Sequence, residues 1–226
     1  TSLLFNIDLP VNFFSPYKAE NIQDFWRRWH ITLSRFLRDY VYIPLGGNQR
    51  GERRTLWNLF LTFLLGGLWH GASWTFVFWG VLHGLAMVVH RLWTKLNFRM
   101  NRALAWFLTF NFVTFAWVFF RAKTWTDAWK VLRGMTGFSG ISLPGFLASK
   151  FPVLERLPIQ FSDIEDVHKK ALALFLGLAL VLFAKNSVQL QQEFRPSWRN
   201  AVFCLLLMAI GLISLTKVSE FIYFNF

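Results

Sequence analysis

Apolar residues run through this chain in stretches of membrane length, and basic residues stand between the stretches. The longest stretch covers residues 56–90, and a second, flanked by arginines, covers residues 103–120. Two shorter stretches follow at residues 171–184 and 201–216. Because a transmembrane helix needs about 20 mostly apolar residues, we expect an all-α, polytopic helical membrane protein with about four or five transmembrane helices.

The stretch at residues 56–90 is longer than one bilayer crossing needs, and it is rich in glycine. We therefore predict one bent or broken intramembrane segment over residues 56–90, with the break near residues 66–73. Irregular backbone at membrane depth must be covered by protein or water. His70 lies in this break, and an ionisable side chain at such a depth indicates a functional site.

Residues 21–40 carry a different pattern, with basic and aromatic residues on opposite sides of a helix. At 100° per residue, four arginines fall within an arc of roughly 100°. They are Arg27, Arg28, Arg35 and Arg38. This arrangement predicts an interfacial amphipathic helix over residues 21–40, with its basic face toward lipid headgroups. His30 falls at the edge of the aromatic side, so we expect it to face protein.

Composition agrees with a membrane protein, since 54% of the 226 residues are hydrophobic and 16% are charged. The net charge of +12 comes from Lys and Arg that flank apolar stretches, the usual arrangement at a lipid surface. We therefore expect contact with membrane lipids and not with nucleic acid. The single cysteine excludes an intrachain disulfide. We treat residues 1–226 as one membrane domain.

The residues around His70 suggest a substrate-binding face. Spacings of three and four residues place Gly67, His70, Gly71 and Trp74 on one helical face. The glycines would leave room for a ligand or a second backbone, and the indole would supply a flat wall. The alternative is a structural histidine that is hydrogen-bonded to the carbonyl of a neighbouring helix.

Other polar residues in the apolar stretches are weaker candidates. Asn58 and Asn111 can hydrogen-bond across helices, and Asn58 is also a candidate for substrate binding. His83 and His90 are seven residues apart, whereas helical zinc ligands are usually four apart. Because no Cys, Asp or Glu joins them in that run, we expect no metal site.

Two long motifs, WRRWHITLSRFLRDYVYIPLGGN and GGLWHGASWTFVFWGVLHG, resemble the membrane-bound O-acyltransferase (MBOAT) family. The similarity is greatest to the bacterial branch that includes the alginate O-acetylation membrane protein. The D-alanyl transfer protein of teichoic acids is a more distant match. The resemblance implies that His70 is the catalytic base and that His30 is the family's upstream polar residue. It also implies that this chain is the C-terminal part of such a protein, with the N-terminal half missing.

The resemblance implies transfer of an acyl group, expected to be acetyl, to a hydroxyl in an exported polysaccharide pathway such as alginate acetylation. An alcohol is a poor nucleophile at neutral pH and needs a base within hydrogen-bond reach. No bound cofactor is expected, and the acyl donor would be an acetyl thioester or an acyl carrier protein. The implied partners are a periplasmic or other extracytoplasmic acetyltransferase and polysaccharide export proteins. The implied location is the bacterial inner membrane, with several crossings.

Other functions remain open at this point. Within the family, the reaction could be D-alanyl transfer or lipid acyl transfer. A transporter would also show broken helices and an intramembrane histidine, but no internal repeat and no acidic residue in a predicted span supports one. A non-enzymatic subunit of an export complex is the third possibility. Activity loss in His70→Ala with normal protein level would distinguish the enzyme from both.

Overall fold

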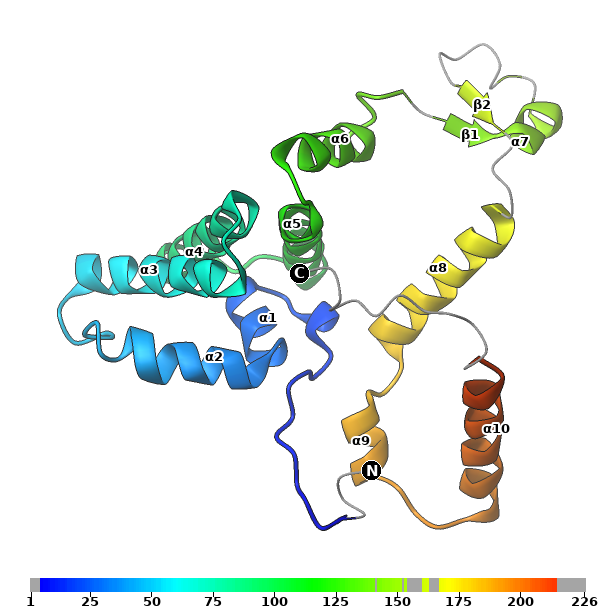
Figure 1. Ribbon diagram of the computed structural model, residues 1–226, viewed down its shortest axis with the longest axis horizontal. Coiled ribbons are helices and arrows are strands. Elements are labelled where there is room, and N and C mark those ends of the chain that lie inside the picture. The colour runs from blue at the N-terminus through cyan, green and yellow to red at the C-terminus, as the bar shows by residue number, and fades with distance from the viewer. Residues whose placement is uncertain (1–4, 141, 152, 154–159, 163–166, 215–226) are drawn as a thin grey trace. The chain divides into compact units, whose positions relative to one another are not determined.

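The computed structural model describes residues 5–140, 142–151, 153, 160–162 and 167–214 (Figure 1). The chain divides into two compact units, Thr1–Ala184 and Lys185–Phe226. The described residues are mostly helical, in agreement with the predicted all-α class. The end of the apolar stretch predicted at residues 201–216 lies outside the described residues.

The segment predicted as one helix over residues 21–40 is broken. It forms α1 (Ile22–Arg28), α2 (Ile31–Leu37) and one π-helical turn (Arg38–Tyr42). Trp29 is extended, and His30 adopts a left-handed conformation with φ 43° and ψ 57°. The prediction of one continuous helix is therefore wrong at these two residues. A single helical wheel over residues 21–40 does not describe where the arginine side chains lie.

The chain before α1 supplies the partners that this break needs. The Ile31 amide donates to the Asn12 carbonyl at 3.0 Å, and the Thr32 amide and hydroxyl donate to Asn12 Oδ1 at 3.1 and 2.6 Å. The Phe14 amide donates to the Arg28 carbonyl at 2.9 Å. Backbone groups at helix ends have no partner within the helix. The N-terminal segment therefore stabilises the position of His30.

Helices α3 (Glu52–His70) and α4 (Trp74–Lys95) form an antiparallel hairpin, and the break between them falls inside the predicted bend. The two helices lie side by side in Figure 1, and their backbones touch where Gly67 and Gly80 face each other. A Cβ atom on Gly67 would lie 2.5 Å from the Phe76 carbonyl oxygen, and one on Gly80 would lie 2.6 Å from the Phe63 carbonyl oxygen. Small residues are what allow membrane helices to approach this closely.

An ion-pair cluster joins the other end of the hairpin. Glu52, at the start of α3, accepts from Arg91 at 3.0 Å and from Lys95 at 2.9 Å, both near the end of α4. Hydrogen bonds from Arg91 and Lys95 hold the pKa of the Glu52 carboxyl below its usual range. The hairpin is thus joined by backbone contact at one end and by charge at the other.

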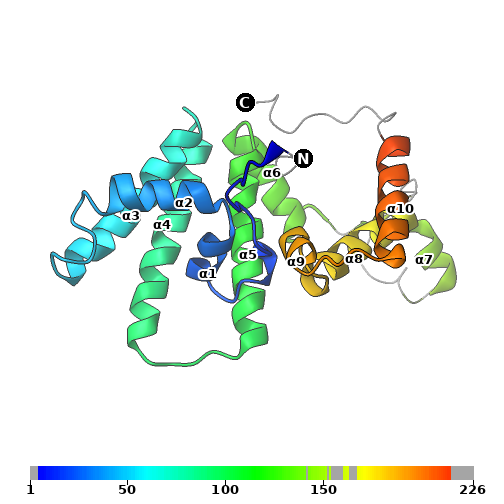
Figure 2. The ribbon, with the colours of Figure 1, turned by 90° about the horizontal axis from the view of Figure 1, so that it is seen from below.

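Helix α5 (Arg102–Arg121) follows α4 and runs in the opposite direction, as Figure 2 shows. Among the described residues, α4 and α5 are the two helices that are long and apolar enough to cross a membrane. Helices α8 (Val167–Phe183) and α10 (Trp198–Ser214) have 17 residues each, fewer than a typical span. Two of the described helices therefore meet this length criterion, and the number of four or five crossings stays a prediction.

The remaining elements are short. A 3-10 turn η2 (Pro16–Lys18) precedes α1, and α6 (Trp125–Met135) follows α5. Strands β1 and β2 pair in parallel, a small exception to the all-α prediction. These strands and the other short helices are β1 (Ser142–Pro144), α7 (Gly145–Lys150), β2 (Gln160–Ser162) and α9 (Ser187–Gln192).

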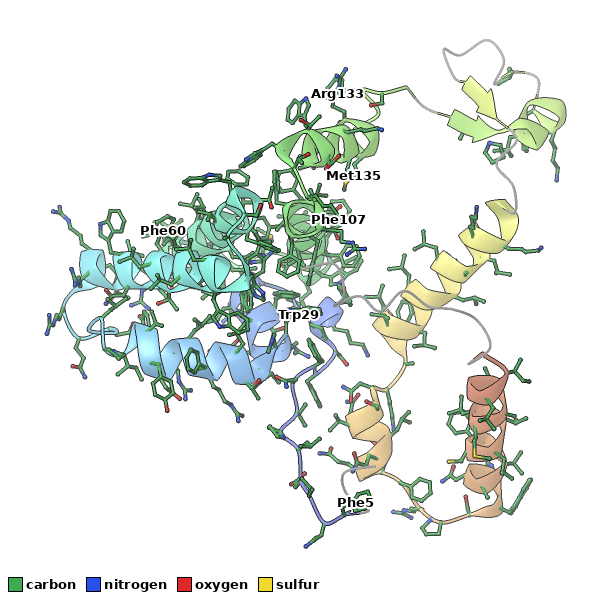
Figure 3. The ribbon with its side chains drawn as sticks, viewed as in Figure 1. Phe5, Trp29, Phe60, Phe107, Arg133 and Met135 are labelled. Carbon is green, nitrogen blue, oxygen red and sulfur yellow. The ribbon has the colours of Figure 1, made fainter. Side chains whose placement is uncertain are left out.

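The described apolar core lies where α1, α3, α4, α5 and α6 meet, and side chains crowd that region in Figure 3. Two hydrogen bonds also join segments that are distant in the sequence. The Thr75 hydroxyl donates to the Ala122 carbonyl at 3.3 Å, and the Trp106 indole donates to the Tyr17 carbonyl at 2.9 Å. The buried members are Ala19, Ile22, Phe25, Trp26, Phe63, Trp79, Met87, Val113, Ala116, Phe119, Ala128 and Leu132.

Replacing Gly80 with Ala tests the backbone contact in the hairpin. The added methyl group meets the Phe63 carbonyl, so the helices must separate, and we expect a loss of about 1–3 kcal/mol in the free energy of unfolding. Thermal unfolding in detergent measures this. Gly134→Ala in α6 is the control, because no atom lies within 4 Å of its added Cβ. Equal stability of both variants would contradict the close approach.

Candidate active site

His70 is the last residue of α3, and its half-buried imidazole lies among aromatic rings. The ring centroids of Trp79 and Phe120 lie 5.3 and 5.0 Å from it, both in edge-to-face geometry. The ring centroids of Trp69 and Phe76 lie 4.9 and 6.3 Å from that of His70. None of the described residues forms a hydrogen bond with this imidazole. A structural histidine bonded to the carbonyl of a neighbouring helix is therefore not seen among them.

The predicted face of Gly67, His70, Gly71 and Trp74 is not formed. Helix α3 ends at His70, so helical spacing does not continue across the break. Trp74 begins α4 and is 74% exposed, whereas Trp79, five residues further along the helix, contacts the imidazole. The sequence did mark the break, since Gly71 and the α4 cap Ser73 both stand in it. The prediction of a shared face was wrong because it applied helical spacing across these non-helical residues.

Three predicted substrate-binding residues are engaged in packing instead. The space beside Gly67 is filled by α4, and Gly71 lets the Phe76 ring approach to 2.9 Å from where a Cβ would stand. Asn58 is fully buried, and its amide donates to the Gly47 carbonyl at 3.0 Å. Twelve residues at about 1.5 Å each put Asn58 about 18 Å from His70 along α3. The structure does not bring Asn58 to the candidate site.

His30 lies in the break between α1 and α2, with the Phe13 ring centroid 6.1 Å away. Its Nδ1 atom is buried and has no hydrogen-bond partner among the described residues. His30 and His70 lie within electrostatic range of each other, so the fold brings the two predicted histidines to one region. Burial lowers the pKa of the His30 imidazole, which favours its neutral form.

Two tryptophans at this site carry buried indole N–H groups without a described partner, Trp79 and Trp117. Both rings contact Phe120, with centroids at 5.2 Å in each case. The Trp117 ring also lies 4.9 Å from that of Trp29, the residue before His30. Trp29 is labelled in Figure 3. An unsatisfied buried donor costs about 1–3 kcal/mol, so several in one place need an explanation. Sequence reasoning missed both tryptophans.

The model of the membrane-bound O-acyltransferase family, MBOAT, matches residues 2–124. That region is more than half of the chain and contains α1 to α5 with both histidines. The chain belongs to this family. The resemblance seen in the two sequence motifs is thus confirmed for the chain, and it is a member of a membrane-bound class of acyltransferases.

The relatives of this MBOAT chain are named for transfer to peptidoglycan, alginate or teichoic acid. Peptidoglycan O-acetyltransferase of Helicobacter pylori is 48% identical over 99% of this chain and 44% of its own length. A probable alginate O-acetylase of Pseudomonas putida is 35% identical over 95% of this chain and 46% of its own length. Teichoic acid D-alanyltransferase of Bacillus subtilis is 33% identical over 54% of this chain and 35% of its own length. This chain spans under half the length of the first two.

His83 is a third histidine that the MBOAT fold places near the site, and it is built into the core. It is 1% exposed, and its Nδ1 accepts from the Trp26 indole at 3.2 Å, which ties α1 to α4. Its ring lies 4.6 Å from Trp79, the neighbour of His70. The described residues hold no group of three or more potential metal ligands. His83 therefore supports the site through packing.

Trp26→Phe tests this buried tie. The substitution keeps an aromatic ring but leaves His83 Nδ1 without its donor, which should cost about 1–3 kcal/mol of unfolding free energy. Chemical denaturation of the protein in detergent measures the loss. Trp57→Phe is the matched control, since that side chain is 60% exposed. A stability change no larger than the control would show that the hydrogen bond is not formed.

Proposed function

We propose that this chain carries the catalytic histidines of an inner-membrane, multi-pass O-acyltransferase. The enzyme moves an acetyl group from a thioester donor to a hydroxyl of a cell-envelope polysaccharide. One observation carries the proposal: His70 stands at a helix break, free of hydrogen bonds within the described residues, and in electrostatic range of His30. Family membership supplies the reaction class.

In the proposed reaction, the neutral His70 imidazole takes the proton of the acceptor hydroxyl while the oxygen attacks the acyl carbonyl carbon. The carbon–sulfur bond then breaks, and the proton passes from His70 to the departing thiolate. The products are an ester and a free thiol. His70 is positively charged between the two proton transfers. A neutral His30 does not oppose that charge and can orient the hydroxyl.

The tetrahedral intermediate needs hydrogen-bond donors at its oxyanion. The Trp79 indole N–H fits that role, because it is buried, lacks a described partner and belongs to a ring 5.3 Å from the His70 ring. The Trp117 indole N–H is also buried and lacks a described partner, but its ring contacts Phe120 and not His70. Inside a water-excluded site such donors act more strongly than in water.

The comparisons favour a peptidoglycan hydroxyl as acceptor. The H. pylori relative is 48% identical over 99% of this chain, while the P. putida alginate O-acetylase is 35% identical over 95%. Alginate is the second candidate. D-alanyl transfer is less favoured, because that relative matches only 54% of the chain. The proposed donor is an acetyl thioester or an acyl carrier protein, and the proposed partners are an extracytoplasmic acetyltransferase and polysaccharide export proteins.

His70→Ala tests the catalytic base. We expect acetyl transfer to fall by about 10²- to 10⁴-fold, because general base catalysis contributes that much. O-acetyl content of the isolated polymer measures it, normalised to protein in the membrane. His90→Gln is the control: it lies about 24 Å along α4 from the hairpin break, at about 1.5 Å per residue. Near-normal acetylation in His70→Ala, or an equal loss in His90→Gln, would contradict the assignment.

Trp79→Phe tests the oxyanion donor. It removes the N–H group and keeps a ring against His70, so kcat should fall by about 100-fold, the effect of removing one such donor. The measurement is kcat at saturating donor, with protein level and thermal stability recorded. Trp57→Phe, which is exposed, should retain the wild-type rate. An unchanged kcat with lowered stability would show that the Trp79 donor is structural.

A further inference from the structure

A hollow of about 480 Å³ lies between the α1–α2 segment and the α3–α4 hairpin. We call it the arginine groove. Arginines line one side, and the other side is built from α3 and α4. The residues that matter here are Arg27, Arg35, Arg38, Leu59, Phe63 and Met87. The sequence predicted that the basic face would point away from protein, but these three arginines border a hollow against the hairpin.

Two arginines of the arginine groove form no ion pair within the described residues, although Asp39 lies within electrostatic range of one of them, Arg35. Arg28 pairs with Asp24 at 2.8 Å, and Arg38 pairs with Asp39 at 2.7 Å. Arg27 and Arg35 are exposed, and neither has an ion pair within the described part of the chain. A hollow that holds two such guanidinium groups attracts an anion, since the planar fork matches phosphate or carboxylate oxygens.

The opposite wall of the groove is apolar. Phe63 and Met87 are buried, Leu59 is half-buried, and all three border the hollow. Polar side chains on that side are already engaged, because the Thr62 hydroxyl donates to the Asn58 carbonyl at 2.6 Å. A small soluble anion would leave this wall uncovered. The chemistry that fits both walls is an anionic head joined to a hydrocarbon chain.

We propose that the arginine groove binds one anionic phospholipid of the surrounding membrane. Its phosphate contacts Arg27 and Arg35, and part of one acyl chain covers Leu59, Phe63 and Met87. Charge complementarity favours an anionic over a zwitterionic lipid, and basic pockets beside membrane helices are known to select such headgroups. The proposal concerns a surface separate from His70 and does not depend on the acyl-transfer reaction.

The bound lipid would support the position of α1. Trp26 lines the groove and also packs edge-to-face on Trp79, with centroids 5.7 Å apart. The same indole holds His83. A lipid that fills the groove therefore stabilises the helix that precedes His30, and its loss should lower the thermal stability of the protein.

Native mass spectrometry of the purified protein in detergent, titrated with phosphatidylglycerol or phosphatidylcholine, tests the proposal. We expect phosphatidylglycerol to bind with one-to-one stoichiometry and phosphatidylcholine to bind at least about tenfold more weakly. The double variant Arg27→Gln, Arg35→Gln should lose at least about tenfold in affinity for phosphatidylglycerol. The control Arg54→Gln, Arg99→Gln removes the same charge from exposed positions and should bind as the wild type does.

A second measurement uses the unaltered protein, so it holds even where a variant fails to fold. Phosphatidylglycerol with a photoactivatable group in its acyl chain should label peptides that contain Leu59 and Met87. Equal weakening in the control variant would overturn the proposal, because binding would then follow net charge alone. Labelling elsewhere would overturn it too. Displacement of the lipid by equimolar glycerol phosphate or coenzyme A would assign the groove to a soluble phosphate ligand.

Discussion

Contact between two helix backbones at Gly67 and Gly80 fixes the geometry on which the candidate site depends. Only glycine fits there, because a Cβ on either residue would lie under 3 Å from a carbonyl oxygen of the other helix. The close approach draws Phe76 and Trp79 of α4 against the end of α3. His70 therefore ends a helix and still has a rigid wall of rings around it, which is the pre-organisation that a catalytic base requires.

Aromatic packing then connects this wall to the second histidine. Phe120 contacts His70, Trp79 and Trp117, and Trp117 contacts Trp29 beside His30. Most of these rings supply rigid apolar surface, whereas the buried indole N–H groups keep hydrogen-bonding capacity inside it. Small-molecule sites are usually mostly apolar, with a few polar groups that fix the orientation of the ligand. The aromatic residues around His70 and His30 therefore give the proposed acyl transfer a largely apolar environment.

Local patterns predicted what local interactions determine. The helix over residues 103–120 and the break near Gly71 follow from apolar runs and glycine, whereas the catalytic roles of His70 and His30 stay predictions. The helical wheels failed where the chain is broken by distant contacts: Asn12 holds the backbone at His30, and α4 folds back onto Gly67. Trp79 was missed for the same reason, since its contact with His70 exists only after the hairpin has closed.

The most direct test of the central claim is an experimental structure of the protein in lipid nanodiscs with a non-hydrolysable acyl-thioester analogue. The account predicts that the acyl carbonyl lies against the His70 imidazole and accepts a hydrogen bond from the Trp79 indole. It further predicts that His30 faces the same space. An analogue bound away from His70, or a Trp79 N–H donated to another protein group, would contradict the account.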